Sequence, residues 1–351
     1  MNFEDFQSAA RQASPPEILT RLIATLEQDQ QYGAWFEALK LQARFELGLE
    51  PWSVAATESL SADVQRQLED RLLDACRVVG ERMIAAGRIA EGWMYLRPVG
   101  DAARAVELLR GVEATEDRID QIIEVALGHG VSPAWGFELL LGRMGTCNAI
   151  TAFDTQMVNA TLPERQQAAA LLVRHLYAEL LKSVRHHGLL QLGTAAGDGE
   201  GPKAELDLVQ WLEQVPDLTA NQNYHADPSH LNSVVRIGRI VDDPEPQRLA
   251  WQLCRYGRQL DALFQPQGYA VFDPYYETHQ AYYEVLLSEE SSPAGLAFFR
   301  ERRAELTRAA EQPTALTWEG QIEATDVLVE LLMRRRQYSD AIEVLMDQLQ
   351  V

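Results

Sequence analysis

The sequence predicts an all-α protein built from antiparallel helix pairs. Three observations favour this fold class: apolar residues recur at intervals of three and four, alternating β-branched runs bounded by turns do not occur, and Pro and Gly stand where helices would begin and end. The chain has 351 residues, of which 46% are hydrophobic, so it can bury a substantial core in more than one compact unit.

Four helices are predicted in the first hundred residues. Ser14 followed by two prolines opens a helix that extends to about residue 28, and a second helix covers about 34–47. A third covers about 62–86, because its apolar side chains form one stripe. The stripe comprises Leu68, Leu72, Cys76, Val79 and Met83. The chain then turns and starts a fourth helix near residue 89.

The segments 85–96 and 334–345 share one layout. Each ends a helix, turns over three or four residues, and starts the next helix with a small residue, Gly92 or Ala341, at the same offset. A small residue there lets two antiparallel helices approach closely. This layout resembles the turn inside a tetratricopeptide-like repeat, over roughly 70–105 and 318–350. The resemblance implies a curved helical-repeat array.

The middle of the chain differs from its flanks. No constant period of about 34 residues runs through it, and six of the seven histidines lie there, with the seventh, His129, at its border. We therefore predict three regions: an N-terminal helical-repeat region at 1–130, an irregular central helical region with a His/carboxylate cluster at 131–290, and tetratricopeptide-like helix pairs at 291–351. A glycine-rich run at 193–201 is predicted to be a loop.

The charge of the chain restricts its partners. Lysine and arginine total 31 and aspartate and glutamate 52, which gives a net charge of −21. A field of this sign repels phosphate backbones and anionic membrane surfaces, so neither nucleic acid nor a membrane is expected as a partner. A basic protein segment, a cation or a small molecule fits this charge better.

Three features lead us to expect a cytoplasmic protein. The acidic N-terminus lacks a basic-then-apolar signal pattern, and no apolar run approaches the ~18 residues of a membrane span. The three cysteines are far apart and form no CxxC pair, which is typical of reduced thiols.

The first candidate for chemistry lies on a long helix predicted from Pro163 to about 187. His175 and Glu179 are four residues apart and share a face, to which His186 returns three turns later. His175 borders the apolar stripe of the helix. In one interpretation His175 is a metal ligand or a general base and Glu179 is its carboxylate partner. In the other, the two side chains form a hydrogen bond inside a helix interface.

The second candidate is the run 223–231, which places His225, Asp227 and His230 within six residues. Asp227 followed by proline is typical of a helix start, so His230 falls one turn inside the helix and His225 just before it. Imidazole and carboxylate are the ligand set of Zn, Fe and Mn. Alternatively, Asp227 only caps the helix.

The third candidate is the run 272–283, which repeats the Asp-Pro start. Tyr275, His279 and Tyr282 share one helical face. They either pack in the core with hydrogen-bonded hydroxyls or form the wall of a polar pocket. Tyr224, Trp135 and Glu138 are further candidates to line a substrate pocket.

Two functions follow from these features. In the first, a divalent metal ion (Fe, Mn or Zn) is held by His225, Asp227, His230 and His279, with His175 and Glu179 as catalytic groups, and a metal-activated water or oxygen attacks a small-molecule substrate. In the second, the chain is a non-catalytic scaffold that docks a basic protein segment on its acidic surface. The sequence does not decide between an enzyme and a scaffold, and it leaves the oligomeric state open.

Overall fold

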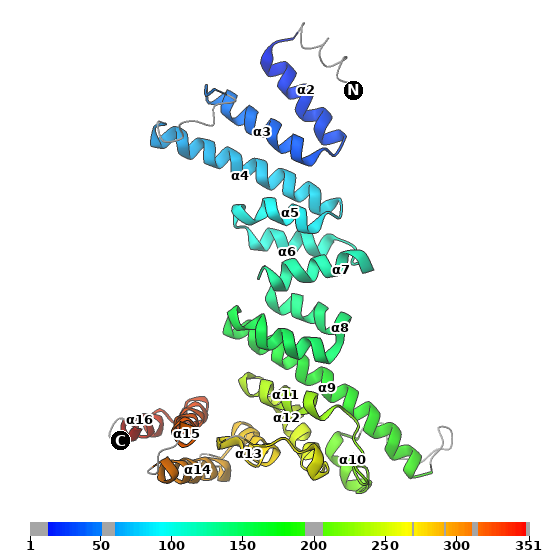
Figure 1. Ribbon diagram of the computed structural model, residues 1–351, viewed down its shortest axis with the longest axis vertical. Helices are drawn as coiled ribbons and strands as arrows, with labels where there is room; N and C mark the ends of the chain where they lie inside the picture. Colours follow the sequence, from blue (N-terminus) through cyan, green and yellow to red (C-terminus); the bar gives the residue numbers. More distant parts are fainter. Residues whose placement is uncertain are drawn as a thin grey trace. The chain divides into compact units, whose positions relative to one another are not determined.

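A computed structural model of the chain describes residues 13–50, 60–193, 206–268, 270–290, 293–310 and 315–348. These ranges contain fifteen α-helices and no strand, so the predicted all-α class is confirmed (Figure 1). From residue 194 on, the predicted glycine-rich loop lies outside the described ranges. No helix in these ranges combines the length and the apolar character needed to cross a bilayer.

The chain divides into two compact units, Met1–Leu139 and Leu140–Val351. The sequence instead predicts three regions, separated near residues 130 and 290, on composition and histidine content. Because each unit has its own core, we describe the units one at a time.

The first unit is a run of helices in which neighbours along the chain pack together. α2 packs on α3, α3 on α4 and α4 on α5, and Figure 1 shows these helices side by side in chain order. The α-helices of this unit are α2 (Pro15–Gln28), α3 (Tyr32–Glu46), α4 (Ala62–Ala85), α5 (Ile89–Leu96), α6 (Ala102–Gly111) and α7 (Glu116–Ile123). α2 begins as predicted, with Ser14 at the N-cap and Glu17 closing a capping box.

Two glycines set the distance between α4 and α5. A Cβ atom added to Gly92 would lie 2.7 Å from Ile84 Cγ1 and 2.8 Å from the Gly80 carbonyl oxygen. One added to Gly80 would lie 2.8 Å from Leu96 Cγ. The predicted close approach at Gly92 is therefore confirmed, and the three-residue turn at 86–88 joins two tightly packed helices.

Helix α8 (Pro133–Thr155) spans the boundary between the two units. It is not one continuous helix, because Gly145 has φ 76° and ψ −178°, far from helical values. The glycine permits this conformation at little cost, since it carries no Cβ atom.

The second unit is organised around the long helix α9 (Leu162–Gln191), which packs on α10, α11 and α12. α9 starts one residue before the predicted Pro163 and ends four residues after 187, and Thr161 with Glu164 forms its capping box. From α12 onward each helix packs on the next along the chain. The later helices are α10 (Leu208–Gln214), α11 (Pro228–Ile237), α12 (Pro244–Gly257), α13 (Tyr275–Leu287), α14 (Ala294–Ala310), α15 (Ala315–Arg334) and α16 (Tyr338–Gln348).

The two Asp-Pro helix starts have different outcomes. Asp227 caps α11 as predicted, since its carboxylate accepts the backbone N–H of Ser229 at 2.8 Å. At α13 the prediction is wrong: the helix begins at Tyr275, and the residue at its N-cap is Pro274 instead of Asp273.

Candidate functional site

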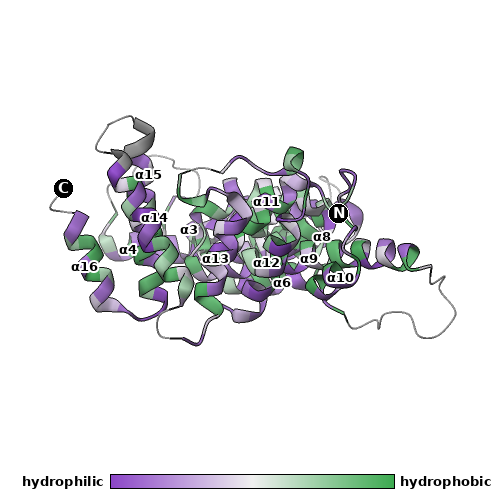
Figure 2. Cartoon of the chain, turned by 90° about the horizontal axis from the view of Figure 1, so that it is seen from below, coloured by the Kyte–Doolittle hydropathy of each residue, from purple (hydrophilic) through white to green (hydrophobic). Residues whose placement is uncertain are grey.

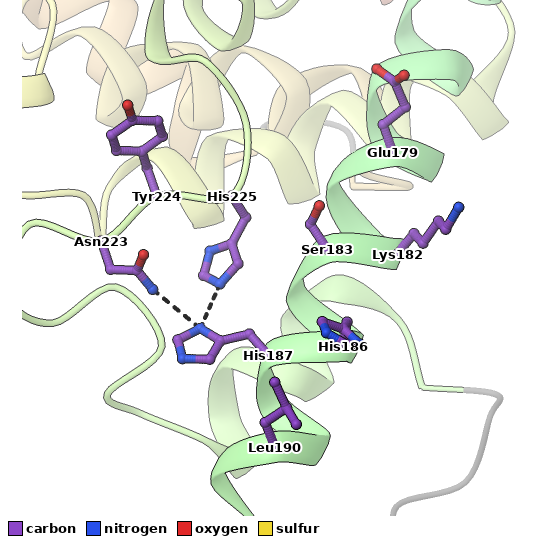
Figure 3. A pocket seen from close by; sticks show the side chains of 9 residues that line it. All are labelled: Glu179, Lys182, Ser183, His186, His187, Leu190, Asn223, Tyr224 and His225. Carbon is purple, nitrogen blue, oxygen red and sulfur yellow. Dashed lines mark hydrogen bonds between the residues drawn. The ribbon is translucent and has the colours of Figure 1, made fainter. Parts of the chain in front are cut away.

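A pocket of about 710 Å³ lies between the C-terminal half of α9 and the segment that precedes α11 (Figure 3). The residues that line it are Glu179, Lys182, Ser183, His186, His187, Leu190, Asn223, Tyr224 and His225. The first six come from α9 and the last three from a stretch without helical structure. The pocket therefore joins two of the segments that the sequence singles out, the long helix and the run from 223.

Packing against α10 fixes the end of α9 that carries the histidines. Trp211 of α10 is fully buried. Its ring packs directly against Gly188, because a Cβ atom added to Gly188 would lie only 2.7 Å from the ring. Because Gly188 directly follows His187, this contact sets the rotation of the helix at the pocket.

The second wall of the pocket is a turn in an uncommon backbone conformation. Asn221 and Gln222 have φ values of 57° and 62°, in the left-handed region that residues other than glycine seldom adopt. The Asn223 amide donates to the Leu218 carbonyl at 2.9 Å, and Thr219 Oγ1 donates to the Gln259 carbonyl at 2.9 Å. These hydrogen bonds hold the turn that presents Asn223 and His225.

Two imidazole rings meet inside the pocket. His187 Nδ1 lies 2.8 Å from His225 Nε2, and the Asn223 amide nitrogen lies 3.1 Å from the same His187 atom (Figure 3). The other nitrogen of His187, Nε2, lies 3.1 Å from the Gln191 amide. Three polar groups from two elements thus converge on one point.

Tyr256 of α12 holds His225 from behind. Its hydroxyl accepts the backbone N–H of His225 at 2.8 Å and lies 2.9 Å from Nδ1 of the same residue's ring. Because the oxygen already accepts the backbone N–H, the hydroxyl proton can be donated to Nδ1. The ring proton of His225 then stands on Nε2, facing His187.

Burial controls protonation at these two residues. Burial, followed by the nearby His187, lowers the pKa of His225 to about 4, so the ring is neutral at pH 7. Burial likewise raises the pKa of the Tyr256 hydroxyl above its usual range, so this group remains a neutral donor and acceptor.

Three predicted site residues line the pocket: Glu179, Tyr224 and His225. His175 lies one turn away on α9 and does not line it; its Nε2 is 3.4 Å from Glu179 Oε1, so the predicted pairing of these two side chains is confirmed. Glu179 also accepts a hydrogen bond from Thr146 Oγ1 at 3.2 Å.

The predicted metal ligands do not surround one point. In the described part of the chain, no group of three or more His, Cys, Asp or Glu side chains is placed to hold a metal ion. Asp227 is used as the α11 cap, and its hydrogen bonds to Ser229 lower the pKa of its carboxyl. His230 stands on the first turn of α11, half-buried and outside the pocket. The described residues therefore do not bring His225, Asp227, His230 and His279 together as one ligand set.

His279 belongs to the core instead. Its side chain is 1% exposed and stacks between Phe272 and Tyr275, with ring centroids 4.2 and 4.3 Å away. Nδ1 donates to the Tyr275 carbonyl at 2.8 Å. Burial, followed by the nearby charge of Arg239, lowers the pKa of this ring to about 3. Of the two interpretations of this stretch, core packing describes His279.

The remaining predicted pocket residues also lie elsewhere. Tyr275 donates to the Asn232 carbonyl at 2.6 Å, and Tyr282 donates to Glu330 at 2.6 Å. Tyr275 lines a separate pocket of about 440 Å³ with Arg258 and Asp273. In the first unit, Trp135 packs on the core with Arg110 stacked on its ring at 5.2 Å, and Glu138 is exposed.

Sequence reasoning missed three residues of the site: His187, Asn223 and Tyr256. The His186-His187 doublet is the one local signal for His187. Asn223 stands two residues before a predicted ligand. Nothing local marks Tyr256, because its contact with His225 spans 31 residues.

Comparisons with protein-family models, with curated proteins and with solved structures found no match.

Proposed function

We propose that His187 and His225 bind a divalent transition-metal ion in this pocket. The observation that carries this proposal is the 2.8 Å separation of two imidazole nitrogens from different elements in a solvent-open pocket. The proposal keeps the metal expected from the sequence and moves it to a different ligand set, in which only His225 was predicted.

The separation of the two nitrogens suits neighbouring ligands of one ion. With metal–nitrogen bonds of about 2.0–2.1 Å, two ligands at a right angle are about 2.8–3.0 Å apart. A right angle is typical of octahedral and square-planar sites, and imidazole is a ligand that suits Zn, Cu, Ni and Fe. The two rings need only to turn so that both lone pairs point at the ion.

The outer ring nitrogen of His225 has a partner suited to this role. A histidine that binds a metal usually donates its other N–H to a protein acceptor, which fixes the tautomer. The Tyr256 hydroxyl lies 2.9 Å from His225 Nδ1 and its oxygen can accept a proton from this nitrogen. A metal at His225 Nε2 would require the ring proton on Nδ1, where the Tyr256 oxygen would accept it as a hydrogen bond.

The open side of the pocket leaves room for water and a small molecule at the ion. A bound divalent ion lowers the pKa of its water toward neutrality and supplies a nucleophile. Glu179 and Tyr224 line the pocket and are exposed, by 57% for the carboxylate side chain and 48% for the tyrosine. We propose metal-assisted attack by water on a small molecule as the reaction class.

Titration calorimetry with Zn²⁺ tests this proposal. The wild-type chain should bind one ion, and His187→Ala or His225→Ala should weaken binding by about 10–100-fold or more, since each removes a direct ligand. His230→Ala is the matched control, because this half-buried histidine lies five residues from His225 and outside the pocket. Equal affinity in all four proteins would sink the proposal.

A scaffold role remains a second proposal, and the tetratricopeptide-like resemblance supports it. α4 with α5 and α15 with α16 are the two helix pairs that carry the expected layout, each joined by a three-residue turn. Both pairs pack closely.

A further inference from the structure

Lys182 lines the pocket between α9 and the segment before α11. Its side chain is exposed, and the described residues give it no carboxylate partner. Lys40 of α3 differs, because its ammonium group lies 2.9 Å from Glu37. An unpaired cation is unusual in a chain with 31 basic and 52 acidic residues. Lys182 is therefore available to hold an anionic group of a bound molecule.

The surface around Lys182 has few acidic residues. From residue 180 to its end at Gln191, α9 has no Asp or Glu, whereas Arg185 and His186 follow Lys182 within the next turn. Figure 2 shows hydrophilic residues among hydrophobic ones along this end of the helix. The helix dipole does not account for Lys182, because its effect on cations is confined to the last turn and Lys182 lies nine residues before Gln191.

Glu179, the carboxylate on the pocket wall, contacts other groups. Its Oε2 accepts a hydrogen bond from Thr146 Oγ1 at 3.2 Å, and its Oε1 lies 3.4 Å from His175 Nε2. Glu179 and Lys182 are three residues apart on α9, a spacing at which an ion pair can form. Instead, the two side chains leave the helix in different directions (Figure 3). The acidic group of the pocket therefore does not neutralise Lys182 by direct contact.

Lys182 and the two paired imidazoles lie on opposite rims of the pocket. In Figure 3 the Lys182 side chain extends from α9 away from His187 and His225. Helix geometry puts the Cα atoms of residues five positions apart, such as Lys182 and His187, about 9 Å from each other. His186 lies between them on the helix surface and also lines the pocket. A small molecule can therefore contact the imidazole rim and Lys182 together.

We infer that the pocket takes a small molecule with an oxyanionic group, a carboxylate or a phosphate, which Lys182 holds. The inference deepens the proposed function and rests on it for the reaction, to which it adds the substrate class. The charge of Lys182 offsets that of Glu179, so a divalent ion at His187 and His225 leaves the pocket with a net positive charge. Lysine is a common ligand of phosphate and carboxylate groups.

Three small probes of similar shape test this inference by ligand-observed NMR. Benzoate and phenyl phosphate carry an oxyanion, and benzamide is a neutral analogue of benzoate. At least one of the two anions should bind the metal-free wild-type chain about ten-fold more tightly than benzamide, the effect of one hydrogen bond to a charged group. Equal binding of all three probes, or of none, overturns the inference.

Three variants localise the anion. Lys182→Gln should weaken binding of the anion about ten-fold, while Lys182→Arg should retain most of it because the positive charge is kept. Lys40→Gln is the matched control, since it makes the same substitution at a lysine of the first unit that pairs with Glu37. An unchanged affinity in Lys182→Gln overturns the inference, and so does an equal loss in Lys40→Gln.

Repeating the titration with Zn²⁺ separates this inference from the metal proposal. Zinc should tighten binding of the anion in the wild type and not in His225→Ala. If zinc has no effect while Lys182→Gln still weakens anion binding, the metal proposal fails and the inference holds. If zinc tightens anion binding equally in the wild type and in Lys182→Gln, and the two proteins bind the anion with the same affinity, the metal proposal holds and the inference is overturned.

Discussion

At the residue scale, the histidines of this chain have different roles that depend on what surrounds each ring. His279 is sealed between two aromatic rings, while His225 reaches an open pocket, and burial lowers the pKa of both. His230 and Asp227 sit beside His225 in sequence but belong to the start of α11. Neighbourhood in sequence therefore does not identify the group that a histidine contacts.

The buried His279 should make the protein sensitive to acid. The unfolded ring has a pKa near 6.5 and the folded ring a pKa of about 3. The contribution of the neutral His279 ring to the free energy of unfolding is therefore fully present above pH 6.5. It is lost as pH falls toward 3, because in this range only the unfolded state takes up the proton. By pH 4.5 this group alone should cost about 2–3 kcal/mol.

Denaturant unfolding of His279→Phe measures this effect. Phenylalanine fits between Phe272 and Tyr275 and cannot be protonated, so the variant should lose less stability than the wild type between pH 7 and pH 4.5. Parallel pH profiles for the two proteins would contradict the assignment of His279 as a buried neutral ring.

At the element scale, the close packing of α4 on α5 depends on glycine. The contacts at Gly92 are with backbone and with the Ile84 side chain, so an added methyl group cannot be accommodated without moving a helix.

Gly92→Ala should therefore destabilise the first unit by about 1–3 kcal/mol. Gly33→Ala in α3 is the control, because a Cβ atom there meets nothing within 4 Å, and alanine should stabilise that helix by up to about 1 kcal/mol. Thermal unfolding of both variants provides the measurement. A neutral Gly92→Ala would mean that the helices are farther apart than described.

The sequence predicts elements better than it predicts contacts between them. The start of α2, the turn at 86–88 and the cap at Asp227 follow from local rules, because each involves residues within one turn of the others. The start of α13 does not follow the Asp-Pro rule, since the Asp273 side chain does not cap the helix. Contacts such as Gly188 on Trp211 join distant segments, and no local pattern encodes them.

The same reasoning explains the site. His225 and Glu179 could be selected from the sequence because their residue types and helical positions are visible there. Their partners could not: His187 and Tyr256 meet His225 only after α9 and α12 have packed. His279 was selected as a ligand but lies in the core. Local sequence could not prevent this error, because a core histidine and a ligand histidine have the same local sequence.

At the scale of the whole molecule, an excess of negative charge acts on folding. The net charge of −21 produces repulsion throughout the folded chain, whereas the observed ion pairs are mostly exposed and individually weak. Screening should therefore stabilise the fold. Raising NaCl from low to physiological strength should increase the melting temperature by about 2–4 °C, the equivalent of roughly 1 kcal/mol. A melting temperature that falls with salt would mean that the ion pairs outweigh the repulsion.

The metal proposal is tested most directly by anomalous diffraction from crystals of the full chain soaked in Zn²⁺. The account predicts one strong zinc peak at about 2.0–2.1 Å from both His187 Nδ1 and His225 Nε2. A pocket without zinc, with the two rings still hydrogen-bonded to each other at saturating metal, would contradict it.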